Sequence, residues 1–391
     1  ILVICMPKIF FLLVLIFFNG AVFTSLTGGV DFFGNTFGFF KTDTFSDEII
    51  QKGRLYIYIS FLVFALGLWR GTKKNFKPKV GMLNDIVKNR LFGLLFLVLS
   101  SLGMIILILR GVDYNAYTSG GASLERFFIP LGIVGISSLL LNRRKNIIFI
   151  LAYSIICFLF TIKVGARAEG LINLSPILLW KLWKNPKISY ILAPVFVFGF
   201  LFVVSFVRIA RDGEMGLYTV SDALTFVFIE GGFTSNLVLM AMEYVDTNGY
   251  AYGLNYLGAL VSIFPKLAFW MANSESSYSM SSALGFYYDK GLILSGFGLG
   301  SSIIAESFFS AGWFGFIFIY LYAYVSMRLC SHPSKSEYIS YLALCSFGYF
   351  LFGIRQDFTF VVRGIVWYSI LPALISLFFV KFYKGRKRGD F

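Results

Sequence analysis

Long apolar stretches recur along the whole sequence and limit the folds open to it. Of its 391 residues, 58% are hydrophobic and only 14% are charged. A water-soluble domain cannot bury so much apolar surface, whereas a bilayer accepts it. A membrane-spanning helix needs roughly 20 apolar residues, sometimes about 17. The sequence therefore predicts an all-α polytopic integral membrane protein with about ten transmembrane helices, at residues 8–26, 53–70, 91–109, 126–142, 146–163, 168–183, 188–206, 304–327, 338–354 and 364–381.

Basic residues are distributed unevenly between the loops that join these spans. With the N-terminus placed in the cytoplasm, 21 of the 34 Lys and Arg residues fall inside, and 17 of the 20 acidic residues fall outside. Because positively charged loops stay on the cytoplasmic side, this asymmetry predicts that both termini are cytoplasmic. The net charge of +14 thus reflects membrane topology and does not indicate a nucleic-acid partner.

The longest loop, residues 207–303, is predicted to lie outside, between the seventh and eighth spans. It holds two further apolar stretches, 217–242 and 252–272, of which the first contains a Gly231-Gly232 break and the second Pro265-Lys266. Both are interpreted as helices embedded in the outer leaflet or lying at its surface, because irregular backbone at that depth must line a cavity or pack on protein. If both cross instead, the count rises to twelve. No soluble domain is predicted, so residues 1–391 form a single transmembrane domain.

Ionisable residues at membrane depth are costly and are functional candidates by default. On the predicted outer side they come from helix ends and from the long loop, so one outward-facing cavity can gather them. Arginine forks onto phosphate oxygens, so the cluster indicates a phosphate or diphosphate ligand. The candidates are Arg167, Arg208, Arg211, Lys266, Arg355 and Arg363 for phosphate binding, and Glu169, Glu306 and Asp357 for acid–base chemistry.

Each candidate also has a purely structural explanation. A lone interfacial arginine such as Arg167 extends to lipid headgroups, and the arginines at the end of the seventh span can anchor lipid in the same way. Arg355 and Asp357 can form a local ion pair. Glu306, in the first turn of its helix, is stabilised by the helix dipole alone. In contrast, Gly165 before Arg167 and Glu169 after it indicate a turn held between two helices.

The predicted outer face lacks the residue types that several kinds of catalysis require. His332, the single histidine, falls in a predicted cytoplasmic loop, so catalysis by histidine at the outer face is not expected. No carboxylates cluster in the pattern that a magnesium-type ion requires. Neither a metal nor another cofactor is therefore predicted, and group transfer at this face would rely on arginines to neutralise a leaving phosphate.

Several motifs follow one another along the chain on the predicted outer side. They are Gly165-Ala166-Arg167, the run Tyr252-Gly253-Leu254-Asn255-Tyr256 leading to Phe264-Pro265-Lys266, Ser302 to Glu306 followed by Ala311-Gly312-Trp313-Phe314-Gly315, and the pair Arg355 and Arg363. By their order and their common side, more than by any single motif, they resemble the O-antigen polymerase (Wzy-type) family of bacterial oligosaccharide repeat-unit polymerases. Lys266 departs from the Pro-Arg of many relatives, which weakens a bidentate role there.

The resemblance implies a glycosyltransferase of the C superfamily in the bacterial inner membrane, active at its extracytoplasmic face in lipopolysaccharide or other polysaccharide biosynthesis. It would transfer a growing glycan from undecaprenyl diphosphate to an incoming lipid-linked repeat unit, with a chain-length regulator as a further partner. Glu306 would be the base, ahead of Asp357 and Glu169. The diphosphate would be held by Arg167 with Arg355 or Arg363, helped by Arg208 or Arg211.

Aromatic residues of the long loop have two interpretations that the sequence leaves open. They can stack on sugar faces, or they can belong to the aromatic belt at the membrane interface. These residues are Tyr250, Tyr252, Tyr256, Trp270 and Tyr278.

Three other functions remain as alternatives. An O-antigen ligase has a similar topology and the same donor, but ligases of that family rely on an outer-face histidine. A flippase or exporter of lipid-linked oligosaccharide predicts more spans, internal repeat symmetry and charges along a central path. A purely structural assembly protein does not explain the outer-side arginines.

Overall fold

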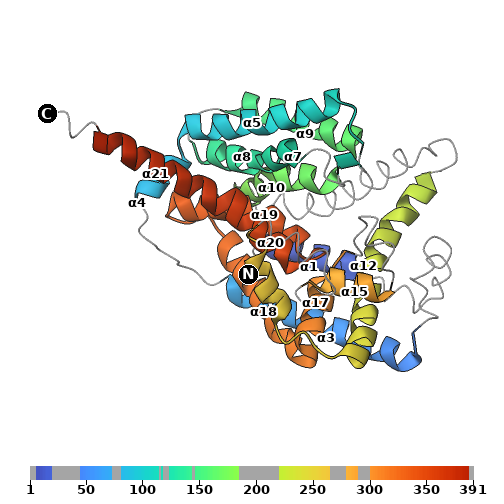
Figure 1. The fold of residues 1–391 in the computed structure, drawn as a ribbon. Helices are drawn as coiled ribbons and strands as arrows, with labels where there is room; N and C mark the ends of the chain where they lie inside the picture. The colour runs from blue at the N-terminus through green and yellow to red at the C-terminus, as the bar shows by residue number, and fades with distance from the viewer. Residues whose placement is uncertain are drawn as a thin grey trace. The chain divides into compact units, whose positions relative to one another are not determined.

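The computed structural model describes residues 6–19, 45–72, 81–113, 116–117, 123–142, 146–184, 220–264, 279–288 and 300–386. Within these ranges the chain consists of helices joined by turns, and no strand occurs (Figure 1). The all-α prediction is therefore confirmed for the described residues.

Six helical runs are long and apolar enough to cross a membrane. They coincide with the second, third, fourth, fifth, eighth and last predicted spans, and the chain is a multi-pass membrane protein. The runs are Asp47–Gly71, Arg90–Leu109, Leu124–Leu141, Ile147–Val164, Ile303–Cys330 and Phe358–Phe379. Two shorter apolar helices, Pro7–Ile16 and Glu337–Phe352, fall at the first and ninth predicted spans.

Two of the predicted spans differ from the structure in detail, and a third lies outside the described residues. Residues 168–183 do form a helix, α10 (Arg167–Lys184), but its terminal charges keep it out of the six. The last run begins at Phe358, six residues before the predicted 364, because α20 (Phe358–Ile365) continues through a π-helical turn into α21 (Leu371–Arg386). The span at 188–206 lies outside the described residues, so the total of about ten stays a prediction.

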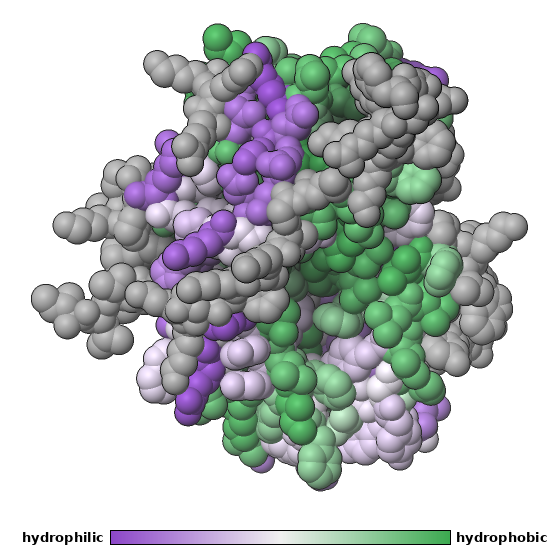
Figure 2. Space-filling view, turned by 90° about the vertical axis from the view of Figure 1, so that its left-hand side faces the viewer, coloured by the Kyte–Doolittle hydropathy of each residue, from purple (hydrophilic) through white to green (hydrophobic). Residues whose placement is uncertain are grey.

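Rows of exposed apolar side chains run along the candidate spans. On α5 (Arg90–Leu109), Leu91, Leu95, Val98 and Leu102 all point outward and recur every three or four residues. The helix α9 (Ile147–Val164) repeats the pattern over most of its length. Figure 2 shows hydrophobic residues covering broad areas of the surface in that view. Such a surface is stable against lipid but not against water.

The described chain divides into two compact units, and the prediction of a single transmembrane domain stays a prediction. Unit 1 comprises residues 1–73, 187–328 and 350–363. Unit 2 comprises residues 74–186, 329–349 and 364–391.

Unit 1 is organised around α12 (Val220–Asn248), a helix of 29 residues. The helix α12 packs against α1 (Met6–Asn19), α3 (Asp47–Gly71), α15 (Met280–Tyr288) and α17 (Ile303–Ala311). The expected break at Gly231-Gly232 is wrong, since α12 continues through both glycines. A glycine costs a helix about 1 kcal/mol relative to alanine, which packing along four neighbours readily offsets.

Two glycines allow close packing in unit 1. In α3, Gly67 and Gly71 form a Gly-x-x-x-Gly pair that faces α18 (Phe316–Cys330). A Cβ atom at Gly67 would lie 2.6 Å from the carbonyl oxygen of Tyr320, and one at Gly71 would lie 2.6 Å from that of Tyr324. Backbones approach this closely only where no side chain intervenes, which is the usual device for joining helices within lipid.

In unit 2, the helices α5, α8 (Leu131–Leu141), α9 and α10 pack together (Figure 1). Gly135 of α8 lies against α5, where a Cβ atom would come within 2.8 Å of Leu97 Cβ. The hydroxyl of Ser100 donates to the carbonyl oxygen of Ile129 at 2.5 Å and lies 2.8 Å from the Tyr153 hydroxyl. These buried hydrogen bonds fix the register of α5 against its neighbours.

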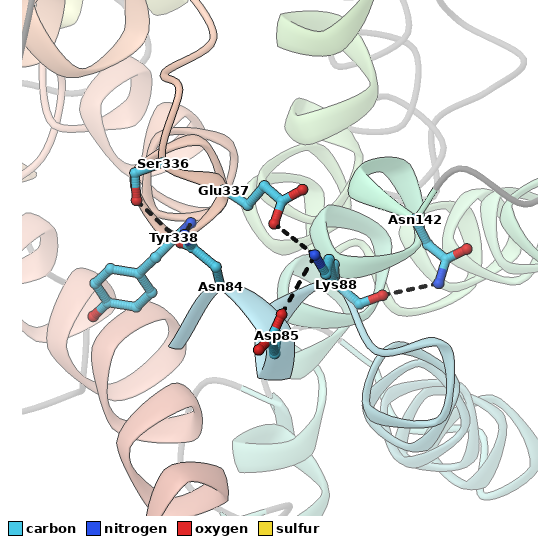
Figure 3. Close-up of polar contacts among 7 residues, drawn as sticks. All are labelled: Asn84, Asp85, Lys88, Asn142, Ser336, Glu337 and Tyr338. Carbon is cyan, nitrogen blue, oxygen red and sulfur yellow. Dashed lines mark hydrogen bonds and ion pairs between the residues drawn. The ribbon is translucent and has the colours of Figure 1, made fainter. Parts of the chain in front are cut away.

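A polar network joins α4 (Gly81–Val87) to the start of α19 (Glu337–Phe352), as Figure 3 shows. The side-chain oxygen of Asn84 accepts hydrogen bonds from the backbone N–H of Tyr338 at 2.8 Å and from the hydroxyl of Ser336 at 3.1 Å. Asn84 thereby fixes α4 to the N-terminus of α19 within unit 2.

Lys88 extends this network on the same side of unit 2. Its ammonium group lies 3.1 Å from the carboxylate of Glu337 and 3.4 Å from that of Asp85 (Figure 3). Its carbonyl oxygen accepts a hydrogen bond from Asn142 at 2.8 Å. All these residues lie in segments that the sequence places on the cytoplasmic side.

Candidate active site

Glu306 lies one turn into α17, on a helix start that is fixed by a serine. The hydroxyl of Ser302 accepts the backbone N–H of Ile304 at 3.2 Å and so caps the helix. The same hydroxyl donates to the side-chain oxygen of Asn19, at the end of α1, at 2.7 Å. The carboxylate of Glu306 is consequently carried on a rigid, buried turn, where the residue is only 1% exposed.

Two donors orient the Glu306 carboxylate. The side-chain amide of Asn255, in α13 (Leu254–Val261), donates to Oε1 at 3.3 Å. The backbone N–H of Phe358, the first residue of α20, donates to Oε2 at 2.8 Å. A buried carboxylate needs such donors, because burial without compensation is expensive. Each oxygen keeps a lone pair free to accept a proton.

Asp357 immediately precedes the residue that donates to Glu306, so the two acids are neighbours. Its Oδ2 accepts hydrogen bonds from the hydroxyl of Ser281 at 2.6 Å and from that of Ser279 at 3.3 Å. Burial raises the pKa of the Asp357 carboxyl, whereas hydrogen bonds from Ser281, Ser301 and Ser279 and the charge of Arg363 act in the opposite direction.

The two arginines of this segment differ in their surroundings. Arg355 is half-buried, and its guanidinium lies 5.3 Å from the centre of the Phe18 ring. Arg363 is exposed and attracts Asp357 electrostatically. Arg363 lies in α20, which forms ahead of the predicted start of the last span. Unit 1 thus brings together two acids and places two arginines on the same short segment.

Unit 2 contains the Arg167 turn that the sequence predicts. The helix α9 ends at Gly165, which has a φ of 77° and donates its N–H to the carbonyl oxygen of Thr161 at 3.1 Å. Arg167 then begins α10, and its side chain lies outside the described atoms. Glu169 is half-buried and accepts a hydrogen bond from the Tyr117 hydroxyl at 3.3 Å.

A cation lies next to the Tyr117–Glu169 pair. The guanidinium of Arg126, in α7 (Ser123–Phe128), is 4.9 Å from the centre of the Tyr117 ring. Burial raises the pKa of the Tyr117 hydroxyl, so this hydroxyl remains a donor to Glu169. Glu169 therefore has a structural partner of its own within unit 2.

The model of one protein family, described as the O-antigen polysaccharide polymerase Wzy, matches residues 2–387. The chain belongs to the O-antigen polysaccharide polymerase Wzy family. This confirms the resemblance carried by the motifs. No curated protein and no solved structure matches it.

Membership in the Wzy family supports a polymerase acting on lipid-linked oligosaccharide repeat units, in a multi-pass membrane protein. Family members are polymerases of the glycosyltransferase type. For this Wzy-family chain, the roles of individual residues stay predictions. Arg208, Arg211 and Lys266 lie outside the described residues, as do Trp270 and Tyr278.

Several polar residues that hold the carboxylates were not among the sequence candidates, among them Asn255, Ser279 and Ser281. Asn255 belongs to the Tyr252–Tyr256 run that contributed to the resemblance, so a signal existed. Nothing in the sequence distinguishes Ser279 and Ser281 from the other serines of that loop. They lie 78 and 76 residues before Asp357, so only the folded chain shows that they meet it.

Proposed function

We propose that this protein polymerises lipid-linked oligosaccharide repeat units at the outer face of the bacterial cytoplasmic membrane. In each cycle the growing glycan moves from undecaprenyl diphosphate to a hydroxyl group of an incoming repeat unit. The observation that carries the chemistry is the Glu306–Asp357 pair, two neighbouring carboxylates at the edge of a membrane span. A pair of acids, one buried and the other half-buried, is costly at that depth and indicates a functional site.

The reaction requires a base and a stabiliser for the leaving group. The acceptor hydroxyl oxygen attacks the anomeric carbon, the bond from that carbon to the diphosphate oxygen breaks, and Glu306 takes the hydroxyl proton. Asp357 is the second choice for the base and Glu169 the third. Glu306 ranks first because two donors hold its carboxylate in one orientation while each oxygen can still accept.

The departing diphosphate carries negative charge that arginines can neutralise. Arg355 and Arg363 flank Asp357 in sequence, and preorganised cations at a site sheltered from water stabilise developing charge most effectively. Arg167, at the α9–α10 turn, is kept as a proposed diphosphate-binding residue, and so are Arg208, Arg211 and Lys266. A metal ion is not part of this proposal.

Contacts within each unit support the assignment of the site to one face. In unit 1, Asn19 of the first predicted span meets Ser302 at the outer start of the eighth. In unit 2, the segments around Asn84 and Ser336, both predicted cytoplasmic, meet each other. Tyr117, which also lies in unit 2, meets Glu169, and both are predicted to be outside.

Complementation of a strain that lacks this gene tests the function. The length of surface polysaccharide is measured on a gel, together with the amount of the protein in membranes. Restoration of a ladder of chain lengths by the wild-type gene is expected. Glycan reduced to single attached repeat units in the deletion strain indicates a polymerase, whereas loss of all attached glycan indicates a ligase or a flippase and refutes the proposal.

The Arg167→Ala variant tests the diphosphate role in the same strain. It is expected to abolish the ladder while protein abundance stays at the wild-type level, because Arg167 lies at a helix start whose turn is formed by Gly165. The matched control is Lys163→Ala, an exposed cation at the end of α9. A full ladder from Arg167→Ala would remove this residue from the site.

A further inference from the structure

A turn next to Glu306 presents tyrosines on the surface of unit 1. It joins α12 to α13, and the backbone N–H of Ala251 donates to the carbonyl oxygen of Phe309 at 2.9 Å. The Tyr250 ring lies over Gly312, where a Cβ atom would be 2.7 Å away, and 6.3 Å from the Phe308 ring. The turn is thus fixed to α17, the helix that carries Glu306.

Two further contacts extend this surface along α12. The ring of Tyr244 lies 5.5 Å from that of Phe309, so Tyr244 and Tyr250 rest on adjacent phenylalanines of α17. Tyr287 of α15 lies edge-on to Tyr244 at 5.3 Å, and its hydroxyl meets the hydroxyl of Thr247 at 3.5 Å. We call Tyr244, Tyr250, Tyr252 and Tyr287 the tyrosine surface.

Tyr252 is the most exposed member and has an unusual backbone. It is 83% exposed, and its φ of 49° lies in the left-handed region, where it is the one non-glycine residue of the described chain. Asparagine and glycine adopt this conformation at little cost, whereas a bulky side chain does not. A tyrosine kept in such a position, with its ring 6.1 Å from that of Tyr250, is typical of a functional site.

Mostly acidic and amide groups surround the rings, and Lys52 of α3 is a cation that interacts electrostatically with Asp246 and Tyr250. The hydroxyl of Tyr288 donates to the carboxylate of Glu243, and Asp246 and Asn248 are exposed on the same end of α12. Aromatic belts at a membrane interface meet lipid phosphates, which carboxylates repel. A pyranose ring instead offers an apolar face of C–H groups to an aromatic ring and hydroxyl donors to nearby carboxylates and amides.

We propose that the tyrosine surface binds sugar rings of the growing glycan next to the Glu306–Asp357 pair. This inference rests on the proposed function. Asn255 connects the two places, since it follows the turn by two residues and donates to Glu306 at 3.3 Å. Sugars bound on the surface keep the glycan engaged with the protein between successive transfers.

Variants of Tyr252 separate sugar stacking from folding. Tyr252→Asn removes the ring but suits the left-handed backbone, so the variant stays folded. Tyr252→Phe keeps the ring, and Tyr252→Leu keeps the apolar character without a ring. Phe314→Ala is the matched control, because Phe314 is 78% exposed in unit 1 but lies within a candidate span.

The probe is the glycan of the host strain, released from its lipid carrier and fractionated by length, and its binding to the purified full-length protein is measured. Tyr252→Asn and Tyr252→Leu are expected to raise the Kd about fivefold, the effect of losing one aromatic contact. Tyr252→Phe and Phe314→Ala are expected to bind as the wild type does. In the complemented strain, long chains are expected to fall about fivefold relative to short ones for the first two variants.

Two results would overturn the inference. If Tyr252→Asn binds the glycan with wild-type affinity, no sugar binds at that ring. If Tyr252→Leu binds glycan and forms long chains as the wild type does while Tyr252→Asn does not, the residue is a membrane anchor. Failure of the proposed polymerase function gives a different result from failure of this inference. In that case the wild-type gene does not restore a ladder, and the binding of glycan to the purified protein is measured independently of the ladder.

Discussion

Replacing Glu306 separates the two tasks of this carboxylate, which are to accept a proton and to satisfy two buried donors. In Glu306→Ala, the N–H of Phe358 and the amide of Asn255 both lose their acceptor. An unsatisfied buried donor costs about 1–3 kcal/mol, so the free energy of unfolding is expected to fall by about 2–6 kcal/mol. Glu306→Ala is therefore expected to be depleted from membranes as well as inactive.

Glu306→Gln keeps the shape of the side chain and can keep both contacts. Its Oε1 accepts from the Phe358 N–H, and its amide donates to Oδ1 of Asn255, an atom that is buried and has no partner among the described residues. This requires only that the Asn255 amide rotates by half a turn. The free energy of unfolding is expected to change by less than about 1 kcal/mol.

The Gln side chain cannot accept a proton from the acceptor hydroxyl. The rate of glycan transfer is expected to fall by about 10²–10⁴-fold, the usual contribution of a general base. Thermal unfolding of detergent-purified protein measures stability, and the gel ladder of the complemented strain measures transfer. Glu48→Gln, the same change at an exposed glutamate of the same unit, serves as the control.

Two outcomes would refute this reasoning, and they refute different parts of it. A full ladder from Glu306→Gln removes Glu306 as the base and leaves Asp357 as the next choice. A Glu306→Gln protein that unfolds as readily as Glu306→Ala shows that the Asn255 amide cannot rotate, so the hydrogen-bond argument is wrong.

Two further predictions concern stability, both measured by thermal unfolding in detergent. Gly67→Ile is expected to lower the free energy of unfolding by about 1–3 kcal/mol or more, because the new side chain meets the backbone of α18. The control Leu62→Ala, at a residue of the same helix that is 72% exposed, is expected to have little effect in detergent. Asn84→Ala is expected to cost about 1–3 kcal/mol by leaving the Tyr338 N–H unpaired, while Asp85→Ala breaks an exposed ion pair worth at most about 1 kcal/mol. Equal effects within either pair contradict the contacts described.

The membrane helices were predictable from hydropathy and charge, because lipid imposes a length and a polarity on each span. The spans at 91–109 and 146–163 fall within one residue of the observed runs. The turn at Gly165-Ala166-Arg167 was also predictable, since glycine favours the left-handed end of a helix. Glycine led to an error at Gly231-Gly232, where tertiary contacts of α12 outweigh local preference.

The acids Glu306 and Asp357 were recognisable as candidates because a charge at membrane depth is costly wherever the chain folds. Their arrangement was not recognisable. Asn255 is 51 residues before Glu306, and Ser281 is 76 residues before Asp357, so no local pattern links them. Contacts at such separation depend on how the helices pack.

The sequence by itself determined the class of protein, the family and the kind of residue that a membrane-embedded site needs, because these follow from composition, charge and motif order. The tertiary structure decided which acids share a site and which donors orient them. It also decided that Tyr252 is held in a left-handed turn, three residues before the Asn255 that donates to Glu306. These depend on packing, since a backbone N–H such as that of Phe358 acquires a partner only when two distant segments are brought together.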